Sequence, residues 1–356
     1  MRGAMVRPAT VCRYGNAAVA AAIALYFFAA PVAILLFALT DPALRGRGIP
    51  QCARRWHRAL TPLYARWARE RIASGRAASL TKLDVSGTEW PLFGSVYYLL
   101  ATEALQKDWE KHPSGTAPKE YAREAIDAAA DLVTDPRHAS WVRKYWGDGY
   151  LHKQNCFYRM LLISAAASHA KLTGSTKYLP LLRDQVETLS AEINNSPAGW
   201  IDDYPRECYP ADVLVAVAAI LRADAVLGTD HSALSRRALR GFSGKSLDAD
   251  TGLPPYMGIS RDGSPMGPAR GCANSYVAIF GPEVWPDAAR GWYALYEKQF
   301  WQRRWWGAGF REWPRAAPHG EWYVDVDSGP VIAGFGTSAC AFGIGAARTN
   351  GRFDHS

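Results

Sequence analysis

The sequence contains few residues arranged as metal ligands or redox centres. Its six cysteines are scattered over 356 residues, and no two of them are separated by only two positions. The eight histidines, among them His152, His169 and His319, show no spacing typical of a zinc site or a catalytic triad. We therefore expect no metal site and no bound cofactor. Scattered cysteines are typical of small buried apolar side chains and are compatible with a reducing compartment.

Charge is absent from the first long apolar run. Residues 15–40, GNAAVAAAIALYFFAAPVAILLFALT, exceed the roughly 20 residues needed to cross a bilayer. The apolar core of a cleaved signal peptide is shorter, about 7–15 residues. A buried core helix of a water-soluble protein would need a polar face, which this run lacks. The sequence therefore predicts one transmembrane anchor.

Arginines lie on both sides of this run. Arg2, Arg7 and Arg13 precede it, and five arginines follow it between Arg45 and Arg58. The heavier cluster after the run favours a cytoplasmic C-terminal domain, attached to a bacterial inner membrane. We expect four segments: an N-terminal tail (1–14), the anchor (15–40), a basic juxtamembrane linker (41–79) and the main domain (80–356).

Acidic residues are outnumbered by basic ones, which gives a formal net charge of +8. Much of the excess lies between Arg45 and Arg76, directly after the apolar run. Basic residues in that position typically contact lipid headgroups. We therefore expect membrane lipid, and not nucleic acid, as a partner of this region.

Past the anchor, apolar residues recur at helical spacing. Gly174 and Gly228 provide helix stops. Aromatic residues mark the intervening loops about every fifty residues, which is the length of two helices and two loops. This period predicts an all-α toroid of helical hairpins, in which inner helices begin at loops that face a central funnel. The predicted helices are 90–109, 119–135, 157–174, 177–195, 211–228 and 285–302, and the marker aromatics are Trp90, Trp146, Trp200, Tyr256 and Trp306.

The loop IDDYPRECYPAD, residues 201–212, concentrates ionisable groups before an apolar helix. Asp212 lies at the start of that helix, where a carboxylate can cap the helix and interact with its dipole. Capping does not explain why other carboxylates crowd the same loop. Carboxylates that share a half-buried funnel differ in pKa, so that one is protonated and one ionised, as acid–base catalysis requires.

Aromatic content of 12% favours a cleft with flat apolar walls for a small apolar or amphipathic molecule. Asp325 and Asp327 form a second acid pair, which is equally typical of a turn. Arg270 precedes a further predicted helix whose first polar residues can point into the funnel. The expected substrate-binding residues are Trp90, Trp200, Asp202, Tyr204, Glu207, Cys208, Tyr209, Tyr256, Cys272 and Asn274.

Three segments together resemble the linalool dehydratase/isomerase family: YRMLLISAAASHAKLTGSTKYLPLL, IDDYPRECYPADVLVAVAAILRADAVLGTDH and DSGPVIAGFGTSACAFGIGAARTNG. The resemblance covers roughly residues 80–350. It implies an (α/α)6 barrel that interconverts alcohol isomers and an alkene without a cofactor, using acid–base groups in an apolar pocket. It also implies a homo-oligomer, and a closing pair of helices beyond the point where this sequence ends.

The resemblance places the first family acid on Asp84, and Trp90 stands where the family has tyrosine. The two family cysteines, counted back from Gly228, fall on Asp203 and Asp212, and the family histidine falls on Leu161. Asp84, Asp203 and Asp212 are therefore the candidate catalytic residues. Cys208 matches neither family cysteine.

Three function classes remain open at this point. The first is a membrane-anchored lyase or isomerase that hydrates, dehydrates or isomerises an alkenol or another lipid-like hydroxyl compound. The second is a carbohydrate-active α/α-toroid enzyme, either a glycosidase or an epimerase, because tryptophan-lined walls and carboxylate pairs also suit sugars. The third is a barrel that binds a ligand without catalysis.

Overall fold

The computed structural model describes residues 8–317 and 319–355 and comprises two compact units, Met1–Arg55 and Trp56–Ser356. Arg2 and Arg7, and half of the tail expected at 1–14, lie outside the described residues. The second unit begins at Trp56, inside the range that we assigned to a linker. That range contains helix α3, Gln51–Ser74, whose inner face is small and polar and therefore gives a weak core pattern in the sequence.

The first unit is dominated by an apolar helix near the N-terminus. It consists of α1 (Pro8–Ala24), a wider turn η1 (Leu25–Ala29) and α2 (Ala30–Leu39). The widening lies just before Pro31, whose ring and missing N–H disturb the preceding turn. Within it, Asn16–Leu39 is long and apolar enough to cross a membrane. Length and composition suit a membrane anchor or a signal sequence.

The second unit is mostly helical, as predicted. Five of the six predicted helices are present as single helices, and the range 119–135 is divided at Ala122 into two helices. Helices α8 and α10 end at the predicted stops Gly174 and Gly228, which adopt left-handed φ angles of 70° and 68°. The helices after α3 are α4 (Glu89–Lys111), α5 (Pro118–Tyr121), α6 (Arg123–Thr134), α7 (Ser140–Trp146), α8 (Cys156–Thr173), α9 (Leu179–Asn195), α10 (Pro210–Leu227), α11 (Ser232–Ala238), α12 (Gly271–Val284), α13 (Pro286–Phe300) and α14 (Thr337–Thr349).

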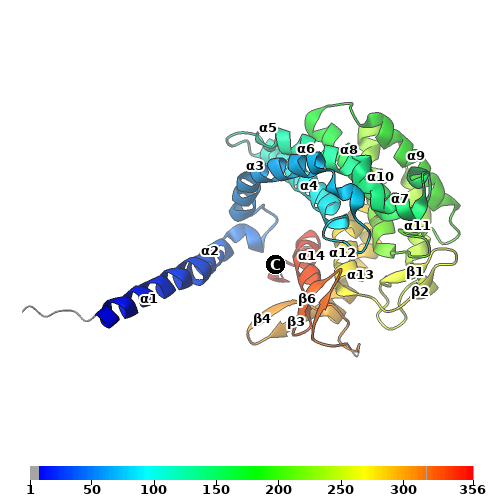
Figure 1. The fold of residues 1–356 in the computed structure, drawn as a ribbon. Coiled ribbons are helices and arrows are strands. Elements are labelled where there is room, and N and C mark those ends of the chain that lie inside the picture. The colour runs from blue at the N-terminus through cyan, green and yellow to red at the C-terminus, as the bar shows by residue number, and fades with distance from the viewer. Residues whose placement is uncertain (1–7, 318, 356) are drawn as a thin grey trace, which may run out of the picture. The chain divides into compact units, whose positions relative to one another are not determined.

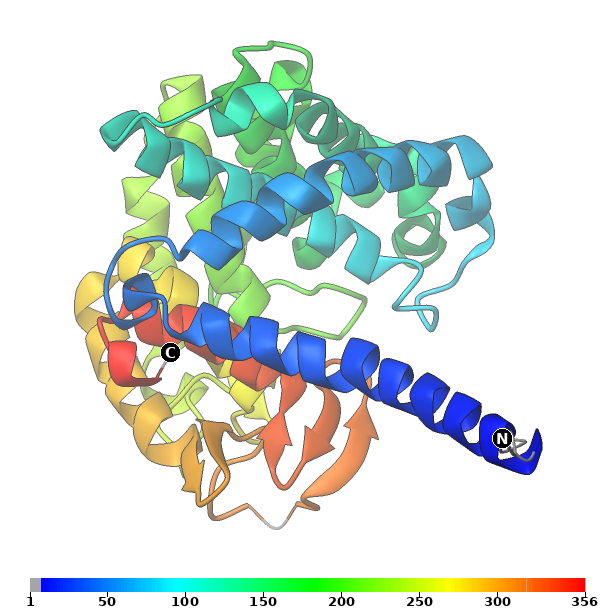
Figure 2. The same ribbon diagram turned by 90° about the vertical axis from the view of Figure 1, so that its left-hand side faces the viewer.

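Strands form only small antiparallel sheets, in the C-terminal half of this unit. Two are hairpins, and in the third β6 lies between β5 and β7. The strands are β1 (Met257–Ile259), β2 (Ser264–Met266), β3 (Trp301–Arg304), β4 (Gly307–Phe310), β5 (Trp322–Asp325), β6 (Gly329–Ile332) and β7 (Phe335–Gly336). Those from β3 onward, drawn in orange, gather at one end of the unit (Figures 1 and 2).

The core lies between helices that pack on one another in chain order. Helix α8 contacts α4, α6, α9 and α10, and α12 contacts α10, α13 and α14. Figure 1 shows this order running around the unit from α3 through α9 to the strands. The Phe93 ring of α4 lies 6.0 Å from the Phe342 ring of α14, so α4 and the last helix, α14, also meet.

Candidate active site

A cavity of about 340 Å³ lies where the N-terminal ends of five helices converge. Helices α4, α8, α10, α12 and α14 each contribute residues from their first two turns. Since side chains of an α-helix lean toward its N-terminus, residues of the first turns reach into the space in front of the helix. The helix residues that line the cavity are Glu89, Trp90, Phe93, Phe157, Ala211, Asp212, Cys272, Ala273, Tyr276, Ser338 and Phe342.

Asp203 and Asp212 line this cavity together, as the sequence predicted for the loop before α10. Burial, and then the charge of Asp212, raise the pKa of Asp203 well above its ordinary value. Burial, followed by the charges of Glu89 and Asp327, raises the pKa of Asp212 to about 8. Because two desolvated carboxylates repel each other, the pair retains at least one proton at pH 7.

The two carboxyl groups differ in their hydrogen bonds. Asp203 Oδ2 accepts the backbone N–H of Tyr209 at 3.0 Å, a bond that favours the ionised form. Asp203 Oδ1 is buried and makes no hydrogen bond of ordinary geometry within the described residues. The backbone N–H of Phe157 nevertheless interacts with this carboxyl group and lowers its pKa by less than burial raises it.

Asp212 does not act as a helix cap. The residue in the N-cap position of α10 is Tyr209, and no side chain caps this end of the helix. The Asp212 carboxyl accepts no hydrogen bond from the backbone of the helix, so capping does not account for an aspartate here. The carboxyl instead faces a cavity lined by further acidic groups.

Two tyrosine–carboxylate pairs complete the polar wall. Tyr204 donates a hydrogen bond to Glu89 Oε1, and Tyr256 donates one to Asp327 Oδ2. Burial raises the pKa of Glu89, and the Tyr204 hydrogen bond lowers it by a smaller amount. Sequence reasoning missed Glu89, although it directly precedes the marker aromatic Trp90.

A buried arginine fixes the wall that carries Asp327. Arg270 Nε donates to Glu312 at 2.7 Å, and its other nitrogens lie 2.9 Å from Asp325 Oδ1 and 3.6 Å from Asp327 Oδ2. Asp325 Oδ1 also accepts the backbone N–H groups of Asp327 and Ser328. Asp325 thus holds the β5–β6 turn, as one sequence interpretation proposed, while Asp327 faces the cavity.

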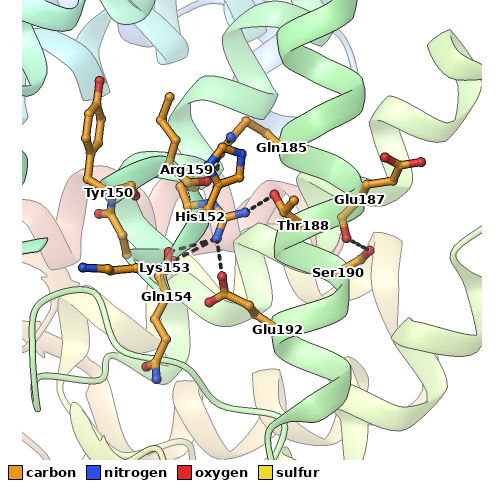
Figure 3. A network of polar contacts seen from close by, with 12 residues as sticks. Tyr150, His152, Lys153, Gln154, Arg159, Gln185, Glu187, Thr188, Ser190 and Glu192 are labelled. Atoms are coloured by element: carbon orange, nitrogen blue, oxygen red, sulfur yellow. Dashed lines mark hydrogen bonds and ion pairs between the residues drawn. The ribbon is translucent and has the colours of Figure 1, made fainter. Parts of the chain in front are cut away.

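A second buried arginine supports the opposite wall. Figure 3 shows Arg159, on α8, between helix α9 and the loop that precedes α8. Its side chain is fully buried, and its N–H groups donate hydrogen bonds to acceptors on α9 and in that loop. The acceptors are Gln185 Oε1, Thr188 Oγ1, Glu192 Oε1 and the carbonyl groups of Lys153 and Gln154.

The loop held by Arg159 in turn binds the residue next to Asp203. Gln154 Oε1 accepts the backbone N–H of Asp202 at 2.6 Å, and the N–H of Cys156 donates to the Asp202 carbonyl at 3.0 Å. These two bonds fix the backbone on which Asp203 is carried. Arg159 therefore positions Asp203 without lining the cavity.

The remaining walls are aromatic, and the rim is polar. Phe93, Phe157, Tyr276 and Phe342 cover the inner part of the cavity beside Trp90. At the rim, Lys82 Nζ lies 2.7 Å from Glu207 Oε1 and 4.6 Å from the centre of the Tyr204 ring. The rim lysine therefore neutralises one outer carboxylate, and its charge also lowers the pKa of Glu89 by a small amount.

Asp84 lies outside the cavity, in contrast to the family-based expectation. Its side chain is exposed, and Oδ2 accepts the backbone N–H and the hydroxyl of Thr81 at 3.1 and 3.2 Å. This short-range turn holds the chain before α4 and uses the carboxylate for bonds to Thr81. Glu89 is the residue of this segment that supplies a carboxyl group. Leu161, at the position of the family histidine, is a buried core residue outside the cavity lining.

Eight of the expected residues line the cavity: Trp90, Asp203, Tyr204, Glu207, Tyr209, Asp212, Tyr256 and Cys272. Four expected substrate-binding residues do not: Trp200, Asp202, Cys208 and Asn274.

The residues outside the lining have structural contacts. The Trp200 ring packs on Gly258, and Asp202 Oδ2 accepts the Arg206 N–H at 2.8 Å. Asn274 Nδ2 donates to the carbonyl groups of Pro254 and Arg270.

Within residues 8–317 and 319–355, no group of three or more His, Cys, Asp or Glu side chains has an arrangement that could hold a metal ion.

In comparisons with known proteins, no family model matched this sequence, and no curated protein sequence matched it.

Proposed function

We propose that this protein is an acid–base enzyme that removes water from, adds water to or isomerises an alkenol or a similar lipid-like hydroxyl compound. The observation that carries the proposal is the Asp203/Asp212 pair, two carboxyl groups with raised pKa in one aromatic-lined cavity. The resemblance of the surrounding segments to the linalool dehydratase/isomerase family supports the same reaction class. In this chain the aspartate pair takes the place of the family's two cysteines.

In the proposed reaction one aspartate donates a proton to the leaving hydroxyl group, and the other accepts a proton from carbon. Asp212, protonated near neutral pH, donates its proton to the substrate hydroxyl oxygen, and the C–O bond breaks with both electrons leaving on water. Aromatic faces around the cavity stabilise the resulting carbocation. Asp203, which is ionised when the pair holds a single proton, accepts a proton from the adjacent carbon, and a double bond forms. Proton return from Asp203 to Asp212 completes the cycle, and the reverse sequence hydrates the alkene.

An α/α toroid is the fold that we propose for the second unit. Its support is the convergence of five helix N-termini on one cavity, together with the meeting of α4 and α14 through Phe93 and Phe342. In a toroid, inner helices that begin at the same end produce such a convergence. An outer helix follows α8 and another follows α12, namely α9 and α13, in agreement with a hairpin repeat.

We also propose that the apolar helix of the first unit is an uncleaved single-pass anchor, with the second unit in the cytoplasm. The support is the length of the charge-free segment Asn16–Leu39 and the arginine-rich segment that follows it. Carbonate washing of membranes that contain the full chain tests this. The anchored chain stays in the pellet with its original N-terminus, whereas a chain that begins after the span shows cleavage of a signal sequence.

The experiment for the reaction uses the full chain in detergent with a panel of tertiary and primary allylic alcohols and the corresponding alkenes. Gas chromatography with mass detection measures interconversion. We expect turnover by the native protein and a loss of about 10²–10⁴ in rate for Asp212→Asn and for Asp203→Asn, the usual contribution of a general acid or base.

Asp287→Asn is the matched control, because Asp287 also lies in the first turn of a helix but has an exposed side chain. It should retain full activity. Hydrolysis of glycosides by the native protein, without reaction of any alkenol, would replace this proposal with the carbohydrate-active class. Binding of either compound without turnover would indicate a ligand-binding barrel.

A further inference from the structure

Helix α3 presents large apolar side chains to solvent and small or polar ones to the protein. Trp56, Leu60, Leu63 and Trp67 are 52%, 56%, 57% and 42% exposed. Their spacing of four, three and four residues places them on one stripe of the helix. We call these four residues the α3 stripe. A surface helix of a water-soluble protein normally has the opposite pattern, with its apolar stripe facing the core.

The inner face of α3 is fixed by polar contacts, so the helix cannot simply rotate to bury the stripe. His57 hydrogen-bonds with Tyr121 and Thr102, each at 2.9 Å, and Thr61 hydrogen-bonds with Tyr98 at 2.9 Å. Rotation would break these buried bonds, and a buried polar group without a partner costs about 1–3 kcal/mol. The hydrogen bonds of His57 and Thr61 therefore hold the stripe at the surface of the second unit.

The charge of α3 complements an anionic surface. The helix contains six arginines and one glutamate. Arg55 and Arg66 are exposed, and at 100° per residue they flank the stripe on the side away from the core, whereas Arg69 lies nearly opposite the stripe and pairs with Glu124 at 3.3 Å. Tryptophan, leucine and arginine on one exposed side are typical of a helix that lies in the interface of a membrane containing anionic lipid.

The chain itself limits how far α3 can lie from a membrane. Eleven residues separate the end of the apolar segment at Leu39 from Gln51, the first residue of α3. An extended linker of this length spans at most about 40 Å. If Asn16–Leu39 crosses a bilayer, α3 remains within reach of that bilayer's surface.

We infer that the α3 stripe is a membrane-interface surface, which inserts Trp56, Leu60, Leu63 and Trp67 among the acyl chains of an anionic bilayer while the arginines bind lipid phosphates. This surface attaches the second unit to lipid directly, in addition to the anchor. A second copy of the chain would cover the stripe by protein contacts instead, and this is a distinguishable outcome of the test.

One consequence concerns the cavity and rests on the proposed function. An Arg71 nitrogen at the end of α3 donates to the Gly87 carbonyl, which ties the helix to the segment between Leu83 and Trp90. Both of these residues line the cavity, and they are 86% and 40% exposed. With α3 on the bilayer, this apolar edge of the cavity lies close to the lipid in which an alkenol is dissolved.

The test uses the full chain in vesicles of phosphatidylcholine with or without phosphatidylglycerol. The photoreactive residue benzoylphenylalanine replaces Leu63 in one variant and Arg236 in the control. Arg236 is exposed on α11, which lies on the opposite side of the second unit from α3 (Figure 1). Replacing an exposed side chain at either position leaves the core intact, so both variants are expected to fold.

We expect lipid adducts at position 63, increased by phosphatidylglycerol and reduced by salt, and none at position 236. Absence of a lipid adduct at position 63 overturns the inference. A crosslinked dimer through position 63 also overturns it and assigns the stripe to contact between copies. Because adducts are detected by mass and not by turnover, failure of the proposed reaction would leave this result unchanged.

Discussion

The phenol of Tyr204 donates a hydrogen bond to the carboxylate of Glu89, a residue 115 positions earlier in the chain. The bond joins the acidic loop before α10 to the first residue of α4 and closes one side of the cavity. The Tyr204 ring also lies under the ammonium group of Lys82. One side chain thus connects the acidic loop to Lys82 and Glu89, two residues of the segment before and at the start of α4 that the sequence analysis did not select.

Removal of this hydroxyl group should affect both stability and the site. We expect Tyr204→Phe to lower the free energy of unfolding by about 0.5–1.5 kcal/mol, since the half-buried Glu89 loses a hydrogen-bond partner. The pKa of Glu89 should rise further, because the hydrogen bond that lowers it is gone. Thermal unfolding in detergent and the pH profile of activity measure these effects. Tyr145→Phe is the control, since Tyr145 contacts the same ring but is not the donor to Glu89; equal effects of the two variants would contradict the prediction.

The raised pKa of Asp212 predicts how stability depends on pH. Between pH 3.8 and about 8 the folded protein retains a proton that the unfolded chain has released. Stability therefore decreases as pH rises through this window, by at most about 1.4 kcal/mol per pH unit for one group, and is fully present below it. Asp212→Asn should make the decrease shallower, as measured by denaturant unfolding at several pH values.

The control for this pH dependence is Asp230→Asn. Asp230 is exposed, and the Ser232 backbone N–H lowers its pKa. A group with a lowered pKa makes stability rise with pH, so replacing Asp230 should leave the predicted loss of stability at higher pH in place. If the free energy of unfolding varies with pH in the same way for the native protein and for Asp212→Asn, Asp212 is ionised in the folded state and the prediction is wrong.

Gly271, the first residue of α12, has no room for a side chain. A Cβ atom there would collide with the backbone carbonyl oxygen of Arg311, in the segment that also accepts the Gly271 N–H at 2.8 Å. Gly271→Ala should therefore destabilise the protein by about 1–3 kcal/mol and displace Cys272 in the cavity wall. Gly291→Ala, at an exposed position inside α13 with open space around it, should instead stabilise it by about 0.5–1 kcal/mol. Thermal unfolding compares the two, and a neutral Gly271→Ala would refute the steric argument.

Arg159→Met tests the support of Asp203 from the opposite wall. The substitution leaves Glu192 without its buried cation and Gln185 without a donor, which should cost about 3–5 kcal/mol. Arg183→Met, at an exposed position on the same neighbouring helix α9, should change stability by no more than about 0.5 kcal/mol. If Arg159→Met remains folded at low temperature, its turnover should fall while Arg183→Met stays active. Unchanged turnover in Arg159→Met would contradict the conclusion that Arg159 positions Asp203.

The sequence by itself determined the elements whose signal is local. Helical periodicity and glycine stops gave α4, α8, α9, α10 and α13, because an amphipathic or apolar helix is specified by residues within one or two turns of each other. The charge-free segment gave the membrane-length helix for the same reason. Asp203 and Asp212 lie nine residues apart in the acidic loop and the helix start that follows it, and the family resemblance together with the crowding of carboxylates singled them out.

The tertiary structure decided which other groups surround this pair. Glu89 and Asp327 reach Asp212 from α4 and from the β5–β6 turn, and their charges, with burial, raise its pKa. Asp84 lies outside the cavity, in a four-residue turn in which its carboxylate binds Thr81. The apolar stripe of α3 faces outward because distant tyrosine and threonine hydroxyl groups hold His57 and Thr61 inward. Desolvation and charge interactions depend on the distances between segments far apart in the chain, and only packing fixes those distances.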